Sequence, residues 1–230
     1  MNDQVQTLPA YGYEATTAEQ RNRVLRNTYW LLALSMIPTV LGAWLGVATG
    51  ITKGLGGGLG LVVFLGGAFG FMFAIQKTKD SAAGVAVLLG FTFFMGLMLS
   101  RLLGMILGMK SGTGIIMTAF GGTAGVFLVM ATLASVIKRD LSGMGKWLFV
   151  GALVVMIGGI INVFVGSGPM MMVISTLCIG LFSLYMLYDL KQIIDGGETN
   201  YITATLGVYL SLYNVFQSLL IMLGVLSGDD

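Results

Sequence analysis

Seven apolar stretches, separated by short polar connections, constrain this 230-residue chain more than any other feature. A helix needs about 20 mostly apolar residues to cross the hydrocarbon core of a bilayer. The connections are too short to hold further domains, so consecutive helices are expected to lie antiparallel in one all-α bundle. The predicted spans are 28–49, 55–75, 82–99, 114–136, 147–165, 170–190 and 202–226. The segment LLGMILGMK after Arg101 either extends the third helix or lies at the membrane interface.

The composition is that of an integral membrane protein. Hydrophobic residues make up 56% of the chain and charged residues only 10%, whereas a soluble domain carries about 25% charged residues. So few charged side chains cannot cover a soluble surface, and the lipid bilayer is therefore the expected partner. The net charge of +2 is scattered along the chain. Nucleic-acid binding, which needs a basic stripe on one face, is not expected.

Two residue types that support much of enzyme chemistry are almost missing. The chain has no histidine and a single cysteine, Cys178, which excludes imidazole bases, disulfide frameworks and Cys/His zinc sites. A Ser-His intramembrane protease is therefore excluded, and so is a retinal pigment, because no lysine follows Lys191 to form the Schiff base. We expect no enzyme activity, no cofactor and no metal site. Cys178 lies in an apolar run and is interpreted as a buried, inert thiol.

The domain and topology predictions follow from polarity and charge. Residues 1–20 are polar without periodicity and are predicted to form a disordered cytoplasmic tail, with the transmembrane domain at 21–230. The tail lacks the pattern of a cleaved signal peptide. Basic flanks are retained in the cytoplasm, and a cytoplasmic N-terminus with an external C-terminus places nine of the twelve Lys and Arg residues inside. These nine are Arg21, Arg23, Arg26, Lys77, Lys79, Lys138, Arg139, Lys146 and Lys191.

One acidic residue, Asp189, follows the apolar run CIGLFSLYMLY in the sixth span. An acid at mid-membrane costs about 2.5 to 3.5 kcal/mol on insertion scales, which marks it as a functional candidate. Asp189 is therefore the candidate pH sensor or ion-path residue. The alternative is that it reaches the interface near the end of its helix and simply neighbours Lys191. Lys191, two positions away, does not share its helical face, whereas Gln192, three positions away, does.

The seventh span carries small and polar residues spaced 4, 4, 3 and 4 positions apart, which form one helical face. They are Thr203, Gly207, Ser211, Asn214 and Ser218. Lipid cannot satisfy polar groups, so this stripe is predicted to face other helices, at the bundle centre or along a cavity. Thr203, Ser211, Asn214 and Ser218 are the candidate cavity-lining residues. The alternative is interhelical hydrogen bonding without transport.

Two abundant residue types are interpreted as packing. Glycines four positions apart, such as Gly121 and Gly125, are predicted to let helix backbones approach closely in lipid. The 16 methionines are interpreted as adaptable core residues, because no cysteine cluster accompanies them to bind a soft metal ion.

The C-terminal third resembles a known family. The run LYDLKQIIDGGETNYITATLGVYLSLYNVFQSLLIMLG, at 187–224, resembles the Bax inhibitor-1 (transmembrane Bax inhibitor motif) family, and especially its bacterial YccA-like branch. The stretch LRNTYWLLALSM from Leu25 resembles the first helix of that branch, and GGETNY at Gly196 is its most specific marker. The resemblance covers about 21–224. It implies a seven-helix protein of the bacterial inner membrane whose last helix is central.

The resemblance also implies a pH-sensitive calcium leak, closed by a pair of aspartates on the last two helices. Asp189 matches the first aspartate, but where Leu-Tyr-Leu-Asp is usual this chain reads Val-Tyr-Leu-Ser, ending at Ser211. The pair is broken, so coupled titration of two aspartates is not available, although Asn214 is retained. The second span, 55–75, lacks the basic partner of leak members. Arg101 is predicted at the opposite side of the membrane and is not expected to reach Asp189.

Two functions therefore stay open. The first is a pH-sensitive calcium or cation leak through Asp189; calcium prefers six to eight oxygen ligands, so one carboxylate suits passage rather than storage. The alternative follows from the branch, which is associated with the membrane-anchored AAA protease FtsH as a binding partner and a restraint on membrane-protein degradation. This stress-protective function needs no ion conduction.

Overall fold

A computed structural model describes residues 17–228, and within that range the protein consists of seven helices and no strands. All seven are long and apolar enough to cross a membrane, which confirms the predicted fold class. The helices are α1 (Ala18–Thr49), α2 (Gly57–Thr78), α3 (Ala82–Leu107), α4 (Gly112–Val136), α5 (Met144–Val165), α6 (Gly168–Asp195) and α7 (Tyr201–Ser227).

Two helices extend well beyond the apolar stretches that predicted them. α1 begins at Ala18 because Thr17 caps it: the Thr17 hydroxyl accepts a hydrogen bond from the Gln20 N–H, and the Gln20 side chain accepts one from the Thr17 N–H. The predicted tail boundary at residue 20 thus lies inside α1, and residues 1–16 of that tail lie outside the described residues. α3 continues past Arg101 to Leu107, so the segment LLGMILGMK mostly extends the third helix.

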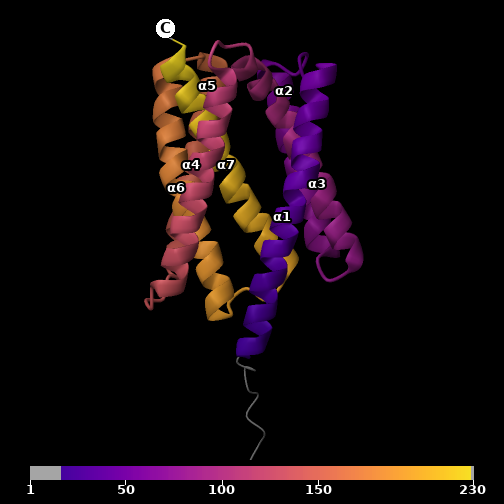
Figure 1. Ribbon diagram of the computed structural model, residues 1–230, viewed down its shortest axis with the longest axis vertical. Coiled ribbons are helices and arrows are strands. Elements are labelled where there is room, and N and C mark those ends of the chain that lie inside the picture. The colour runs from indigo at the N-terminus through magenta and orange to yellow at the C-terminus, as the bar shows by residue number, and fades with distance from the viewer. Residues whose placement is uncertain (1–16, 229–230) are drawn as a thin grey trace, which may run out of the picture.

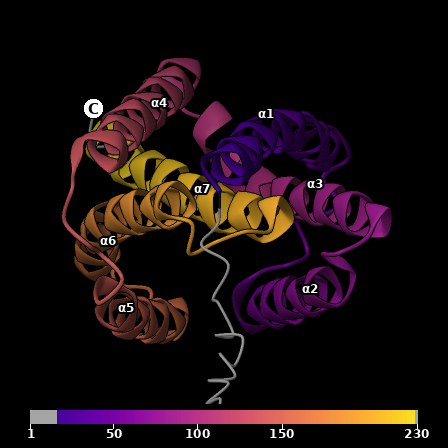
Figure 2. The same cartoon turned by 90° about the horizontal axis from the view of Figure 1, so that it is seen from below.

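α7 is the central helix of the bundle. Seen from below, it lies between α1, α2 and α3 on one side and α4, α5 and α6 on the other (Figure 2). It crosses the bundle diagonally (Figure 1) and contacts every helix except α5. Val208, Tyr209, Val215 and Leu220 of α7 are fully buried or nearly so. The central position predicted for the last helix is therefore confirmed.

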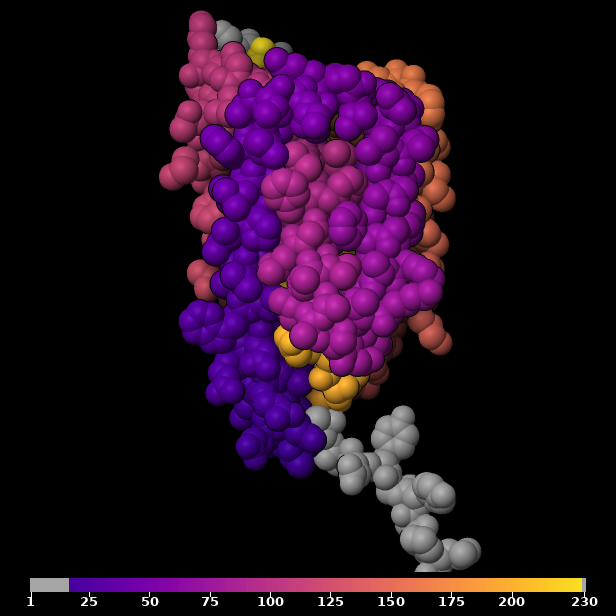
Figure 3. All heavy atoms as spheres, turned by 90° about the vertical axis from the view of Figure 1, so that its right-hand side faces the viewer, coloured from indigo at the N-terminus to yellow at the C-terminus, as the bar shows by residue number. Residues whose placement is uncertain are grey.

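α1 and α3 form the closest pair of helices, and they lie side by side on one face of the molecule (Figure 3). Glycines make this approach possible. A β-carbon at Gly42 would collide with the Phe93 carbonyl oxygen, and one at Gly96 with the Thr39 carbonyl oxygen. Backbone-to-backbone contact of this kind is how helices pack tightly in lipid.

The same prediction was wrong for Gly121 and Gly125. A β-carbon at either position would meet no other atom within 4 Å, and both residues are exposed on the outer face of α4. Spacing identifies a helical face, but it does not say whether that face meets a helix or lipid. Gly42 and Gly96, by contrast, bring the backbones of α1 and α3 together.

Candidate functional site

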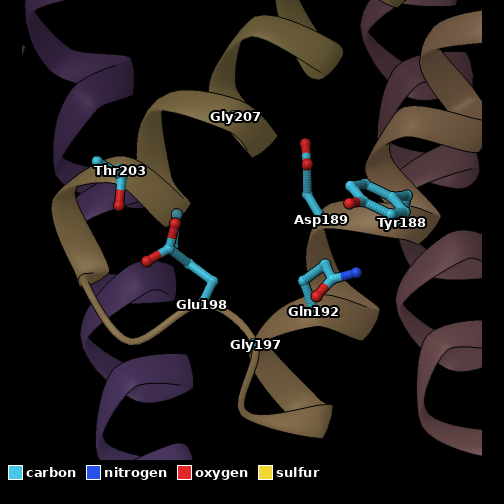
Figure 4. A pocket seen from close by; sticks show the side chains of 8 residues that line it. Tyr188, Asp189, Gln192, Gly197, Glu198, Thr203 and Gly207 are labelled. Carbon is cyan, nitrogen blue, oxygen red and sulfur yellow. The ribbon is translucent and has the colours of Figure 1, made fainter. Parts of the chain in front are cut away.

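A cavity of about 220 Å³ lies where α6 turns back into α7. Figure 4 shows side chains from the end of α6, the connecting turn and the start of α7 around it. Its lining residues are Tyr188, Asp189, Gln192, Gly197, Glu198, Thr203, Ala204 and Gly207. Two carboxylates, one carboxamide and two hydroxyl-bearing side chains thus gather at one end of the two helices.

The turn that forms this cavity depends on glycine. Gly196 ends α6 with φ of 83° in the left-handed region, which is readily available only to glycine. The N–H groups of Gly197 and Glu198 then both donate to the Gln192 carbonyl, at 2.8 and 3.1 Å. The chain is thereby folded back over the last turn of α6, so that Glu198 returns to the same end of the helix as Asp189.

Asn200 fixes the other end of the turn. Its carboxamide oxygen accepts hydrogen bonds from the N–H groups of Ile202 (2.9 Å) and Thr203 (3.3 Å) and so caps α7. Its amide nitrogen donates to the Lys79 carbonyl (3.0 Å) and the Asp80 carboxylate (2.9 Å) in the α2–α3 connection. One side chain therefore joins the start of α7 to a loop more than 100 residues away in the sequence.

Glu198 is tied to the same residue. Its carboxylate accepts a hydrogen bond from the Asn200 N–H at 2.8 Å. The GGETNY run, which the sequence offered only as a family marker, thus has a structural role. Its glycines make the turn, its glutamate faces the cavity and its asparagine caps the next helix.

The Asp189 carboxylate lies against bare backbone of α7. A β-carbon built on Gly207 would stand only 2.9 Å from Asp189 Oδ2, so a glycine at this position leaves room for the acid. The carboxylates of Asp189 and Glu198 are close enough to interact electrostatically. Among residues 17–228, Asp189 makes no hydrogen bond and no ion pair. It is an acid facing a cavity without a cationic partner.

Lys191 does not serve as that partner. Its ammonium group forms an ion pair with Asp195, one helical turn further along α6, at 2.8 Å. Gln192 lines the cavity beside Asp189, and Lys191 does not. The sequence-based statement that Gln192 and not Lys191 shares the face of Asp189 is thus confirmed.

Of the four predicted lining residues, only Thr203 lines this cavity. Ser211 is buried further along α7, Asn214 donates to the Leu210 carbonyl of its own helix at 2.8 Å, and Ser218 lies beside Cys178 of α6. Ser211 and Ser218 thus face other helices inside the bundle, as predicted for the stripe, and none of these three residues lines this cavity. α6 and α7 are in extensive contact, and the cavity lies where the two helices approach the turn.

Sequence reasoning missed Glu198 as the second acid of the site. It lies beyond the apolar span, so a search for acids inside spans passes over it. The available signal was local: an acid between a Gly-Gly helix end and an asparagine that precedes an apolar run. Arg101, as predicted, lies elsewhere, and its guanidinium donates to the Leu55 carbonyl at 2.9 Å in the α1–α2 connection at the opposite end.

The donor set suits a weakly bound hard cation better than a tight metal site. In the described part of the chain, no three His, Cys, Asp or Glu side chains gather around one point. Asp189, Glu198, Gln192 and Thr203 supply oxygen atoms of the kinds that calcium prefers, but fewer protein groups than its usual six to eight oxygen ligands. Water would have to complete such a shell.

Comparison with known proteins gives one consistent answer. A family model described as "Inhibitor of apoptosis-promoting Bax1" matches residues 21–228. An uncharacterized protein of Neisseria meningitidis is 36% identical over 96% of this chain and 98% of its own length. The Escherichia coli K12 protein named "Modulator of FtsH protease YccA" is 37% identical over 94% of this chain and 96% of its own length. The relative with the same identity and coverage in Escherichia coli O6:H1 is named "Inner membrane protein YccA".

Proposed function

The chain belongs to the Bax inhibitor family, and from that premise we propose that it modulates an FtsH-type membrane protease by binding it and restraining its degradation of membrane proteins. The observation that carries this proposal is the 37% identity, over almost the full length of both chains, to a protein named as an FtsH modulator. The names of the family and of this relative point to a membrane modulator rather than an enzyme.

The proposal includes a location and an orientation. We place the protein in the bacterial inner membrane with its N-terminus in the cytoplasm, because that orientation keeps nine of twelve basic residues inside. The start of α1 and the α2–α3, α4–α5 and α6–α7 connections then face the cytoplasm together with residues 1–16. This face supplies the groups that a protease with cytoplasmic domains would meet.

The test is co-purification and proteolysis. Tagged protein co-expressed with FtsH is expected to retain the protease in detergent and to lengthen the half-life of a membrane substrate. Deletion of residues 1–16 is the informative truncation, because it leaves the Thr17–Gln20 capping box intact. We expect the deletion to weaken the restraint on proteolysis while the bundle stays folded. Unchanged substrate half-life with and without the full-length protein would overturn the proposal.

A second candidate function is a pH-sensitive calcium or cation leak through the same end of the bundle. The observation that favours it is the pair of carboxylates, Asp189 and Glu198, that faces one cavity and has no cationic partner among residues 17–228. Beyond the cavity, Val208, Tyr209 and Met186 are completely buried or nearly so. Conduction would therefore need α6 and α7 to separate at this level.

Calcium influx into dye-loaded liposomes tests the leak between about pH 6 and pH 8, the range in which a buried carboxylate can titrate. If the leak exists, Asp189→Asn and Glu198→Gln are expected to change its pH dependence. Asp195→Asn is the matched control, since Asp195 is an acid at the same end but pairs with Lys191 outside the cavity. Flux equal to that of empty liposomes, with folded protein, would remove the leak and leave the protease proposal untouched.

A further inference from the structure

A second concave site lies on the outer face of the bundle and shares no lining residue with the Asp189 cavity. It is an open groove of about 390 Å³ between α1 and α3, with the start of α7 at its floor. Figure 3 shows the first turns of α7 reaching the surface between α1 and α3 at the lower end of this face. The groove is lined by Asn27, Trp30, Leu31, Leu34, Val85 and Tyr201.

The groove is polar at one end and apolar along the rest. Asn27 and Tyr201 stand at the end where α1 emerges from its polar first turns and where α7 begins. Leu31, Leu34 and Val85 continue the lining toward the middle of the membrane. Trp30 is 74% exposed, and tryptophan at this depth is typical of the membrane interface. This gradient matches a lipid, whose glycerol backbone is polar and whose acyl chains are not.

Two arginines stand at the polar end. Arg23 and Arg26 are exposed on α1, four positions before Asn27 and Trp30, and therefore lie one turn below these lining residues on the same faces of the helix. Glu19 and Asp80 form no ion pair with either arginine, and the single ion pair among residues 17–228 is Lys191–Asp195. Asp80 accepts a hydrogen bond from Asn200 instead.

We propose that this groove is a binding site for one acidic phospholipid of the leaflet next to the start of α1. One acyl chain lies along Leu31, Leu34 and Val85, and Arg23 and Arg26 hold the anionic headgroup. The argument rests on charge complementarity: the lining contains no charged side chain, and the exposed residues one turn before Asn27 and Trp30, Arg23 and Arg26, are both positive. It is independent of the protease and leak proposals, because it uses none of the residues of the α6–α7 cavity.

Trp30 makes the site directly observable. The chain has three tryptophans, and replacing Trp44 and Trp147 by Phe leaves Trp30 as the single fluorophore in the groove. The experiment reconstitutes this variant in bilayers that contain brominated phosphatidylglycerol or brominated phosphatidylcholine and compares the quenching of Trp30. A basic side chain near an anionic membrane surface strengthens lipid association about fivefold. Phosphatidylglycerol is therefore expected to quench severalfold more strongly per molecule.

Matched variants distinguish lipid binding in the groove from general attraction of acidic lipid to the charged surface. Arg23→Gln with Arg26→Gln is expected to abolish the preference for phosphatidylglycerol. Lys138→Gln with Arg139→Gln removes the same charge from an exposed segment after α4, at the same end of the bundle, and is expected to leave the preference intact. Val85→Phe, which fills the apolar part of the groove, is expected to reduce quenching by both lipids.

Two outcomes would overturn the proposal. Equal quenching by the two brominated lipids would mean that Trp30 meets only bulk bilayer lipid. An equal loss of preference in the two double-Gln variants would mean that surface potential, and not the groove, selects the lipid. A protein with Trp44 as its single tryptophan gives the baseline, since Trp44 is exposed on α1 almost three turns beyond Leu34, the last lining residue of that helix.

Discussion

The two sides of α7 handle polar groups in opposite ways. Toward α1 and α3, the buried Tyr209 and Tyr213 hydroxyls both find partners. Tyr209 shares a hydrogen bond with the Thr39 hydroxyl at 2.9 Å, and Tyr213 donates to the Met95 carbonyl at 3.3 Å. Toward α6, the same helix presents Gly207 to the Asp189 carboxylate, which has no such partner among the described residues.

The difference separates support from function. Lipid offers no hydrogen bonds, so a satisfied polar group inside the bundle stabilises one arrangement of the helices. An acid without a partner lowers stability, and such residues inside membrane proteins are typically functional. We therefore expect substitutions on the α1–α3 side of α7 to act on stability, and substitutions on the α6 side to act on activity.

The largest effect on stability is expected where α1 meets α3. The side of α7 that faces these two helices, here called its closed side, packs against this pair. Gly96→Val places a side chain on the Thr39 carbonyl oxygen, and the two backbones must separate. We expect the free energy of unfolding to fall by about 3 kcal/mol, the upper range for overpacking. Unfolding in mixed detergent and SDS, followed by tryptophan fluorescence, measures it. Gly121→Val is the control, because nothing lies within 4 Å of that position; an equal loss there would contradict this account of α1 and α3.

The next largest effect on stability is expected in the turn between α6 and α7. Asn200→Ala removes the cap of α7 and the bonds to Lys79 and Asp80, and we expect a loss of about 2 kcal/mol in unfolding free energy. Faster hydrogen exchange at the Ile202 and Thr203 amides would locate the change. Asn200→Asp keeps a capping oxygen and loses the donors. If it is as stable as the unmodified protein, the bridge to the α2–α3 connection contributes nothing.

A smaller effect is expected from the closed side of α7 itself. Tyr209→Phe removes a hydroxyl that bonds Thr39 and donates to the Thr92 carbonyl at 3.4 Å. Interhelical hydrogen bonds in membranes contribute about 1 kcal/mol or less, and we expect a loss of that size in unfolding free energy. Tyr29→Phe serves for comparison, since Tyr29 is 36% exposed on α1. Equal losses in both variants would mean that the hydrogen bonds of Tyr209 contribute nothing specific, because Tyr→Phe leaves the ring contacts in place.

The contrast between the two sides also explains what the sequence could predict. The lengths of the apolar runs predicted the seven spans, because a helix must be long enough to cross the hydrocarbon core. Asp189 was identified because an acid inside a span is costly. Helix starts in polar sequence, such as the capping box at Thr17, carry no hydropathy signal and were missed. Glu198, the second acid of the cavity, was missed too, because it reaches the cavity through a glycine turn rather than through helical periodicity. The polar stripe of α7 was visible, but only tertiary packing decides which of its residues meet open space.

The smallest effect on stability, and the most informative one, is expected on the side of α7 that faces α6 and the cavity. Asp189→Asn keeps the shape of the side chain and removes an acid that makes no bond or ion pair among the described residues. The unfolding free energy is therefore expected to stay within about 1 kcal/mol of the original value and to rise rather than fall, since a partly buried acid without a partner is removed. Gly207→Ala, which pushes a methyl group toward the same carboxylate, is expected to lower stability in the Asp189 protein and less so in Asp189→Asn. A marked loss of stability in Asp189→Asn would make the acid a structural support, and the two sides of α7 would then be alike.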